Sequence, residues 1–131
     1  MRHVLVVDDA VMIRALLRDI LRRDGYVVHE AVSARDAVVR YREVRPDVVT
    51  MDLSLPDGPG VECVARLRGM DPAARIVVIS AMSRDRHEAE ALAAGALAFL
   101  PKPFRPDEVS ETVRGALSRS MSVSMGSGEA G

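Results

Sequence analysis

Acidic side chains stand at the ends of two apolar runs of the sequence. Asp8 and Asp9 come directly after the run that begins at His3, and Asp52 follows a run that ends at Met51. If these runs are neighbouring parallel strands, the three carboxylates converge at one edge of a sheet. Carboxylates this close repel one another and stay ionised only when a cation is bound, and short oxygen ligands suit Mg²⁺. The residues therefore predict a magnesium site, a frequent companion of a phosphoryl group.

A hydroxyl and an ammonium group stand at the ends of two later apolar runs. Ser80 and Lys102 can hold phosphoryl oxygens, and the small side chain of Ala81 leaves room beside them. Each residue also has an ordinary explanation, because Asp9 can cap a helix, the Ser80 hydroxyl can bond to backbone, and Lys102 can be a solvated loop residue. Their shared position after apolar runs favours one common site.

Five apolar, β-branched runs predict short strands that are buried on both faces. They cover residues 3–7, 26–29, 47–51, 75–79 and 97–100. Amphipathic stretches between them predict five helices. The first ends at Gly25, the second begins at a capping box of Ser33 and Asp36 and ends before Pro46, the third covers about 61–70, the fourth runs from a Ser83 cap to Gly95, and the fifth runs from Pro106 to about Leu117.

This alternation predicts an α/β fold with a doubly wound, five-stranded parallel sheet, a (βα)₅ arrangement of the flavodoxin-like kind. Strands separated by helices must be parallel, and right-handed crossovers place helices on both faces of the sheet. Ligands bind beyond the carboxyl ends of such strands. We expect one folded domain over 1–117, followed by a disordered Ser/Gly/Met-rich tail over 118–131.

The composition excludes several classes of protein. The 18 basic and 19 acidic residues nearly cancel, which argues against nucleic acid as a partner. The single Cys63 rules out an internal disulfide and favours an inert thiol in a reducing compartment, and no apolar run is long enough for a membrane span. We expect a cytoplasmic protein without a membrane partner. Only Lys102 is Lys, whereas 17 residues are Arg, which we assign to solvated helix faces and loops.

Four segments together resemble the response-regulator receiver domains of two-component signalling. They are VLVVDDA at 4–10, PDVVTMDLSLPDGPG at 46–60, VVISAMS at 77–83 and GALAFLPKPF at 95–104. The resemblance covers the whole predicted domain and implies the strand order 2-1-3-4-5. It also implies a cis peptide bond between Lys102 and Pro103. The sequence departs from the family at Pro101, where an apolar residue is usual, and proline is tolerable at the end of an edge strand.

The same resemblance implies a role for each candidate residue. Asp52 would accept a phosphoryl group from a phosphohistidine of a sensor histidine kinase or a histidine phosphotransfer protein. Asp9, Asp52 and the backbone carbonyl of Ser54 would bind Mg²⁺ directly, and Asp8 would bind it through a water molecule. Lys102 would stabilise the phosphoryl oxygens. The loop residues Pro56 and Gly60 match the family as well.

Two residues would form the switch of such a domain. By resemblance, the Ser80 hydroxyl moves toward the phosphoryl group, and Phe99 turns inward to fill the space, where most relatives have Tyr. The face of the fourth helix, fifth strand and fifth helix then repacks, and a downstream target protein binds it. We expect slow hydrolysis of the phosphate, because neither Ser54 nor Met82 can act as a strong base.

We therefore expect a signalling module that works by protein binding, of the chemotaxis or phosphorelay type, and not an enzyme. One alternative is the excised receiver of a longer response regulator or hybrid kinase. Another is a magnesium-dependent phosphatase with an aspartyl nucleophile, which usually needs an acid where this chain has Ser54. A flavin-binding protein is disfavoured, since Asp8 and Asp9 would repel a phosphate.

Overall fold

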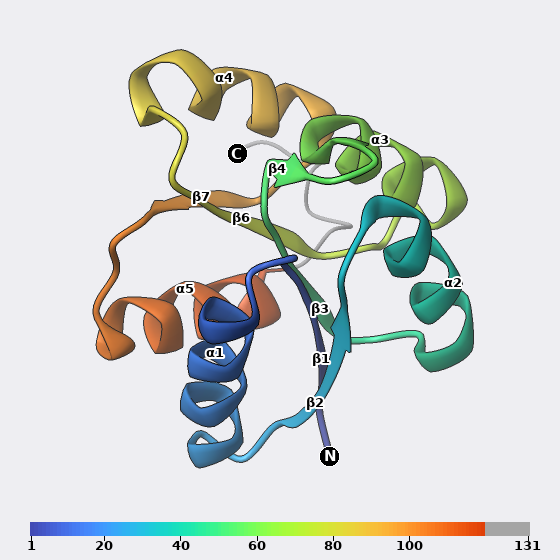
Figure 1. The fold of residues 1–131 in the computed structure, drawn as a ribbon. Coiled ribbons are helices and arrows are strands. Elements are labelled where there is room, and N and C mark those ends of the chain that lie inside the picture. Colours follow the sequence, from blue (N-terminus) through green and yellow to red (C-terminus); the bar gives the residue numbers. More distant parts are fainter. Residues whose placement is uncertain (120–131) are drawn as a thin grey trace.

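The computed structural model of the chain describes residues 1–119 and has one main sheet between two layers of helices (Figure 1). Its five strands are all parallel and lie in the order β2-β1-β3-β6-β7. They are β1 (His3–Val7), β2 (Val27–Ala31), β3 (Val48–Met51), β6 (Ile76–Ser80) and β7 (Ala98–Pro101). Counted along the chain, the strands of this sheet follow the expected order 2-1-3-4-5, so the predicted fold class is confirmed.

Five helices cover the two faces of the sheet. They are α1 (Val11–Arg23), α2 (Ala34–Val44), α3 (Gly60–Met70), α4 (Arg84–Ala94) and α5 (Pro106–Ser118). The buried residues form two clusters, one beneath α1 and α5 and the other beneath α2, α3 and α4. Each helix begins and ends within a few residues of its expected position. None of these helices has the length and apolar character that crossing a bilayer requires.

The central strands contribute to both clusters because successive side chains point to opposite faces. In β1, Val4 and Val6 pack under α1 and α5, whereas Leu5 and Val7 pack under α2 and its neighbours. Strands β1, β3 and β6 are almost entirely buried, as predicted. Strand β2 is only half-buried, so that prediction is wrong there, because β2 lies at the edge of the sheet with a neighbour on one side.

The helix ends agree with the sequence signals at most positions. The Ser33 hydroxyl accepts a hydrogen bond from the Asp36 N–H at 3.0 Å, and Gly25 and Gly95 end their helices with φ of 96° and 118°. The expected side-chain cap at Ser83 is wrong, since only its carbonyl accepts a bond, from His87 N–H. Ser83 is exposed, so water can satisfy the first N–H groups of α4.

Two features of the backbone differ from the sequence-based expectation. A hairpin of two very short antiparallel strands, β4 (Ser54–Leu55) and β5 (Gly58–Pro59), connects β3 to α3. Two-residue strands have no periodicity that a sequence pattern could reveal. The tail was expected to begin at residue 118, but Ser118 closes α5 and the Arg119 guanidinium donates to the Leu97 carbonyl at 2.6 Å. The rest of the predicted tail, 120–131, lies outside the described residues.

Candidate active site at the carboxyl ends of the strands

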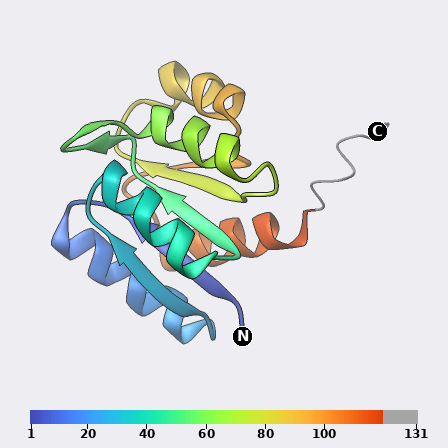
Figure 2. The same cartoon turned by 90° about the vertical axis from the view of Figure 1, so that its right-hand side faces the viewer.

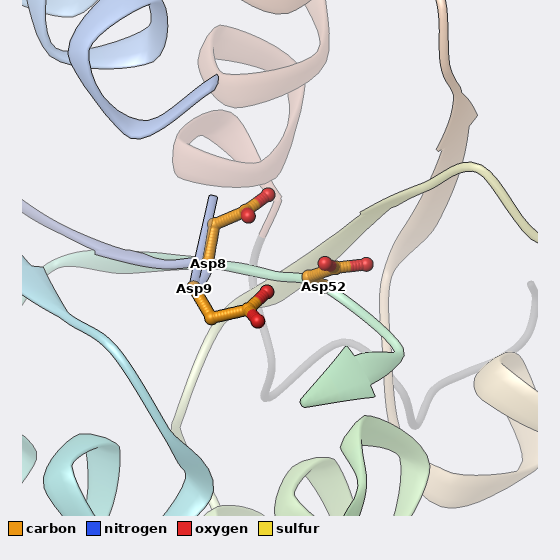
Figure 3. Close-up of side chains that lie close together, drawn as sticks. All are labelled: Asp8, Asp9 and Asp52. Carbon is orange, nitrogen blue, oxygen red and sulfur yellow. The ribbon is translucent and has the colours of Figure 1, made fainter. Parts of the chain in front are cut away.

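Three carboxylates meet where β1 and β3 end (Figure 3). Asp8 and Asp9 follow β1, Asp52 follows β3, and the two strands are hydrogen-bonded neighbours. Each side chain offers an oxygen atom, and these oxygens lie within 4.8 Å of one another. The predicted convergence of the three residues is therefore confirmed, and it follows from the adjacency of β1 and β3.

One ammonium group faces this acidic cluster. Lys102 Nζ lies 2.7 Å from Asp8 Oδ2 and 3.5 Å from Asp52 Oδ2. The Lys102 side chain is only 14% exposed, so the ordinary explanation of a solvated loop lysine is wrong. A single positive charge against three carboxylates leaves a formal excess of two negative charges. This negative charge and this set of oxygen ligands suit a hard divalent cation such as Mg²⁺.

Burial raises the pKa of Asp52, which is 7% exposed. The ammonium of Lys102 acts against this shift, the carboxylate of Asp8 adds to it, and the N–H of Ser54 lowers the pKa slightly by bonding to Asp52 Oδ1 at 3.3 Å. The ionised form of Asp52 is thus held at a cost in free energy. A bound cation beside it would reduce that cost.

The two carboxylates that follow β1 have different surroundings. Asp8 is buried, and its oxygens accept hydrogen bonds from the Ala10 N–H at 2.9 Å and from Lys102. Asp9 is exposed, and the N-cap residue of α1 is Ala10, where no side-chain cap bond forms. The alternative role of Asp9 as a helix cap is therefore wrong. Its carboxylate faces the cluster and is accessible to a metal ion.

The connection after β3 fits closely against the site. A side chain at Gly60 would overlap the carbonyl oxygen of Asp52, and its Cβ would lie 2.7 Å from Leu53 Cα. The Gly60 N–H also donates to the Leu53 carbonyl at 2.8 Å. Only glycine lets α3 begin this close to the turn that carries Asp52. This close approach is the physical reason for a glycine at position 60, eight residues after Asp52. Ser54, whose carbonyl is an expected metal ligand, begins the intervening hairpin.

Ser80 and Lys102 are joined through the backbone at the ends of β6 and β7. The Lys102 N–H donates to the Ser80 carbonyl at 2.9 Å. Ser80 is fully buried, and its hydroxyl accepts a bond from the Met82 N–H at 3.2 Å. The backbone thus satisfies this hydroxyl, as its ordinary explanation requires. A role in switching stays a prediction.

The other expected switch residue, Phe99, lies in the core. Its side chain is 3% exposed and packs in the cluster beneath α2, α3 and α4. Its carbonyl accepts a hydrogen bond from the Arg84 guanidinium at 3.1 Å. The Lys102–Pro103 peptide bond is cis, as the resemblance implied.

Sequence reasoning missed Arg14, which was assigned to a solvated helix face. Its guanidinium donates to the Asp8 carbonyl at 2.9 Å and to Glu30 Oε1 at 2.8 Å, and its side chain is 15% exposed. Arg14 therefore braces the turn that carries Asp8 and Asp9. Its position one helical turn after Ala10 was the available signal. Arg68 is another exception, because it is half-buried and donates to the Gly95 carbonyl at 2.8 Å.

Cys63 shows no sign of reactivity. The residue is 3% exposed, and burial raises the pKa of its thiol to about 11. The Asp57 carboxylate raises this pKa further, while the Arg66 guanidinium lowers it. A thiol with so little thiolate at neutral pH is a poor nucleophile, in agreement with the expectation from the sequence.

Comparison with known proteins assigns the chain to a family. Residues 4–114 match the family model of the response regulator receiver domain. The chain belongs to this family. It is 42% identical to the chemotaxis protein CheY of Thermotoga maritima over 113 residues, which are 86% of this chain and 94% of the relative. It is 39% identical to CheY of Bacillus subtilis, covering 88% of this chain and 97% of that one.

Solved structures agree with this assignment. The receiver domain superposes on the chemotaxis protein CheY4 of Vibrio cholerae with a TM-score of 0.84 and 30% sequence identity, covering 89% of this chain and 99% of that chain. The fold, the acidic cluster and the sequence match identify the chain as a receiver domain, and receiver domains are phosphorylation-switched signalling modules.

Proposed function

We propose that Asp52 accepts a phosphoryl group from a phosphohistidine of a sensor histidine kinase or a histidine phosphotransfer protein. The observation that carries this proposal is the position of Asp52: it is buried, it lies 3.5 Å from the Lys102 ammonium, and it shares an oxygen cluster with Asp8 and Asp9. A lone structural carboxylate would need neither the extra acids nor the buried lysine.

The transfer needs few chemical groups from the protein. A carboxylate oxygen of Asp52 attacks the phosphorus, the P–N bond to the donor imidazole breaks, and the imidazole nitrogen keeps the electron pair. The Lys102 ammonium is placed to neutralise charge on the transferred oxygens. Mg²⁺ held by Asp9, Asp52 and the Ser54 carbonyl, with Asp8 acting through water, would neutralise further charge. The product is an aspartyl phosphate.

Phosphorylation is then proposed to change the affinity for a partner protein. Ser80 and Phe99 lie on the neighbouring strands β6 and β7, and the Phe99 carbonyl is bonded to Arg84 of α4. Movement of the Ser80 hydroxyl toward the phosphate would disturb the contacts between β6, β7 and α4. It would thereby change the surface formed by α4, β7 and α5. A downstream target of the chemotaxis or phosphorelay type would bind there.

The chain itself is proposed to be a phosphoacceptor and not an enzyme with a separate substrate. It would phosphorylate itself from a small phosphodonor and lose the phosphate slowly. Ser54 and Met82, two residues after Asp52 and Ser80, carry no base that could activate a water molecule.

Intact mass spectrometry with Mg²⁺ and acetyl phosphate tests the proposal. The wild-type chain is expected to gain one phosphoryl group and to keep it for minutes or longer after the donor is removed. Asp52→Asn is expected to gain none, whereas Asp57→Asn, altered in the same loop, is the matched control and should gain one. Equal modification of Asp52→Asn and the wild type would contradict the assignment, and loss of the phosphate within seconds would contradict the slow hydrolysis.

A further inference from the structure

A concave surface lies between α2 and α3, and it does not include the acidic cluster. It is a cleft of about 800 Å³ that also includes residues of the β4–β5 hairpin. Figure 2 shows α2 and α3 side by side, with the hairpin at one end of the pair. None of the candidate site residues Asp8, Asp9, Asp52, Ser80 and Lys102 lines this cleft. Its chemistry therefore requires a separate explanation.

Apolar residues make up part of the cleft lining. Val38 and Cys63 are buried, and Pro59 lines the end formed by the hairpin. Val39 of α2 also lines the cleft, and it is 46% exposed. An exposed aliphatic side chain next to buried apolar residues offers contact area to another apolar group.

The charged residues of the cleft have an excess of positive charge. Arg35 and Arg42 of α2 and Arg66 of α3 line it, together with Asp57 and Glu62. Within residues 1–119, the ion pairs leave these three guanidinium groups without an acidic partner. Both carboxylate oxygens of Asp57 already accept backbone N–H bonds, from Ala34 at 2.8 Å and Arg35 at 2.9 Å. The cleft thus offers unused cationic donors.

The spacing on α2 fits a helical partner. Arg35, Val38, Val39 and Arg42 stand at positions i, i+3, i+4 and i+7, so they form one stripe along the helix. The two arginines are about 10 Å apart along the axis, with the aliphatic side chains between them. Carboxylates two turns apart on a second helix, with apolar residues between them, would match this stripe.

We propose that the α2–α3 cleft binds an acidic amphipathic helix of a partner protein. Charge complementarity selects this occupant, because an acidic helix would meet Arg35, Arg42 and Arg66 while its apolar face covers Val39. The binding uses none of the residues proposed for phosphoryl transfer.

The test uses the full chain and a synthetic helical peptide with Glu at positions i and i+7 and Leu at i+3 and i+4. Its matched control has Lys in place of Glu. Backbone amide shifts measured by NMR during titration are expected to move in α2, α3 and the hairpin with the acidic peptide only. The double variant Arg42→Ala/Arg66→Ala is expected to weaken binding about tenfold. The matched double variant on α1, Arg22→Ala/Arg23→Ala, should bind like the wild type.

Several outcomes would overturn the proposal. They are equal binding of the Lys peptide, shifts centred on α4, β7 and α5, an unchanged affinity of the Arg42→Ala/Arg66→Ala variant, and no binding of the acidic peptide at millimolar concentration. If the chain forms a dimer through α2 and α3, detected by sedimentation, the cleft would be assigned to a second copy of the chain. If truncation of the chain after Arg119 changes the NMR amide shifts of α2 and α3, the cleft would be assigned to the chain's own C-terminal end. Asp52→Asn should bind the peptide normally, which separates this test from that of phosphoryl transfer.

Discussion

Asp52 and Asp57 stand five residues apart on the connection between β3 and α3, yet their surroundings differ completely. Asp52 is buried beside Asp8, and burial raises its pKa in spite of Lys102. Asp57 is exposed, and hydrogen bonds from the backbone N–H groups of Arg35 and Ala34 lower its pKa. The same side chain is thus held at a cost in one place and stabilised in the other.

This difference separates the carboxylate that we propose as the phosphoacceptor from a structural one. The charge of Asp57 is satisfied by two N–H groups at the beginning of α2, where the helix dipole favours an anion. The charge of Asp52 is only partly neutralised, because it shares the Lys102 ammonium with Asp8, and the Asp8 carboxylate repels it. An incompletely neutralised, buried carboxylate keeps affinity for a cation, whereas a satisfied carboxylate holds two segments together.

The largest expected effect comes from removing the shared ammonium. Lys102→Met leaves three carboxylates without a cation, and we expect the free energy of unfolding in metal-free buffer to fall by about 3 kcal/mol. Added Mg²⁺ should stabilise this variant more than the wild type, because the site becomes more negative. Urea unfolding followed by circular dichroism, with and without Mg²⁺, measures both effects. Unchanged stability without metal would show that Lys102 does not neutralise the cluster.

Neutralising Asp52 should have a smaller effect of the opposite sign. Because the folded protein raises the pKa of Asp52, its ionisation costs stability at pH values above that pKa. We expect Asp52→Asn to raise the free energy of unfolding at pH 7 without metal, by less than Lys102→Met lowers it, because the substitution relieves repulsion and desolvation. Added Mg²⁺ should reduce the difference in stability between Asp52→Asn and the wild type, since the wild type binds Mg²⁺ better.

Asp57→Asn is the matched variant for this measurement and should lower stability, because it removes charged acceptors from the beginning of α2. The same urea series compares the two variants. A change of the same sign in both would remove the distinction between the two carboxylates.

Asp71 provides an intermediate case and the smallest expected effect. The Tyr41 hydroxyl donates to Asp71 Oδ2 at 2.7 Å, and this bond is the main cause of the lowered pKa of Asp71. A lowered carboxyl pKa contributes stability above the ordinary value of 3.8 that is lost as the pH falls. Tyr41→Phe should therefore lower the free energy of unfolding by somewhat less than about 1 kcal/mol at pH 7. The loss should become smaller as the pH falls below 3.8. Thermal unfolding across this pH range measures the change, and a constant difference would contradict it.

Much of the fold could be predicted because local signals and the global arrangement agree. Apolar runs such as His3–Val7 alternate with helices, so parallel strands and a site at their carboxyl ends follow. The β4–β5 hairpin and the half-exposed state of β2 could not be predicted from the patterns of these segments. They depend on what packs beside a segment and not on its own pattern.

The candidate site was predictable for the same reason, since Asp8, Asp9 and Asp52 each follow a strand. The pairing of Lys102 mainly with Asp8, at 2.7 Å, was not predictable. Neither was the brace that Arg14 forms with the Asp8 carbonyl and Glu30. These are contacts between segments far apart in the sequence, and only the packed structure sets their distances.

The sequence by itself determined the order of the elements, the α/β class and the residue types available at the strand ends. Chain connectivity and side-chain periodicity are local properties, and the sequence contains them completely. The tertiary structure decided which carboxylate is buried, which is satisfied and where guanidinium groups are left without partners. Burial and charge neutralisation arise between segments, and this is why Asp52 and Asp57, so close in the chain, differ so much in the fold.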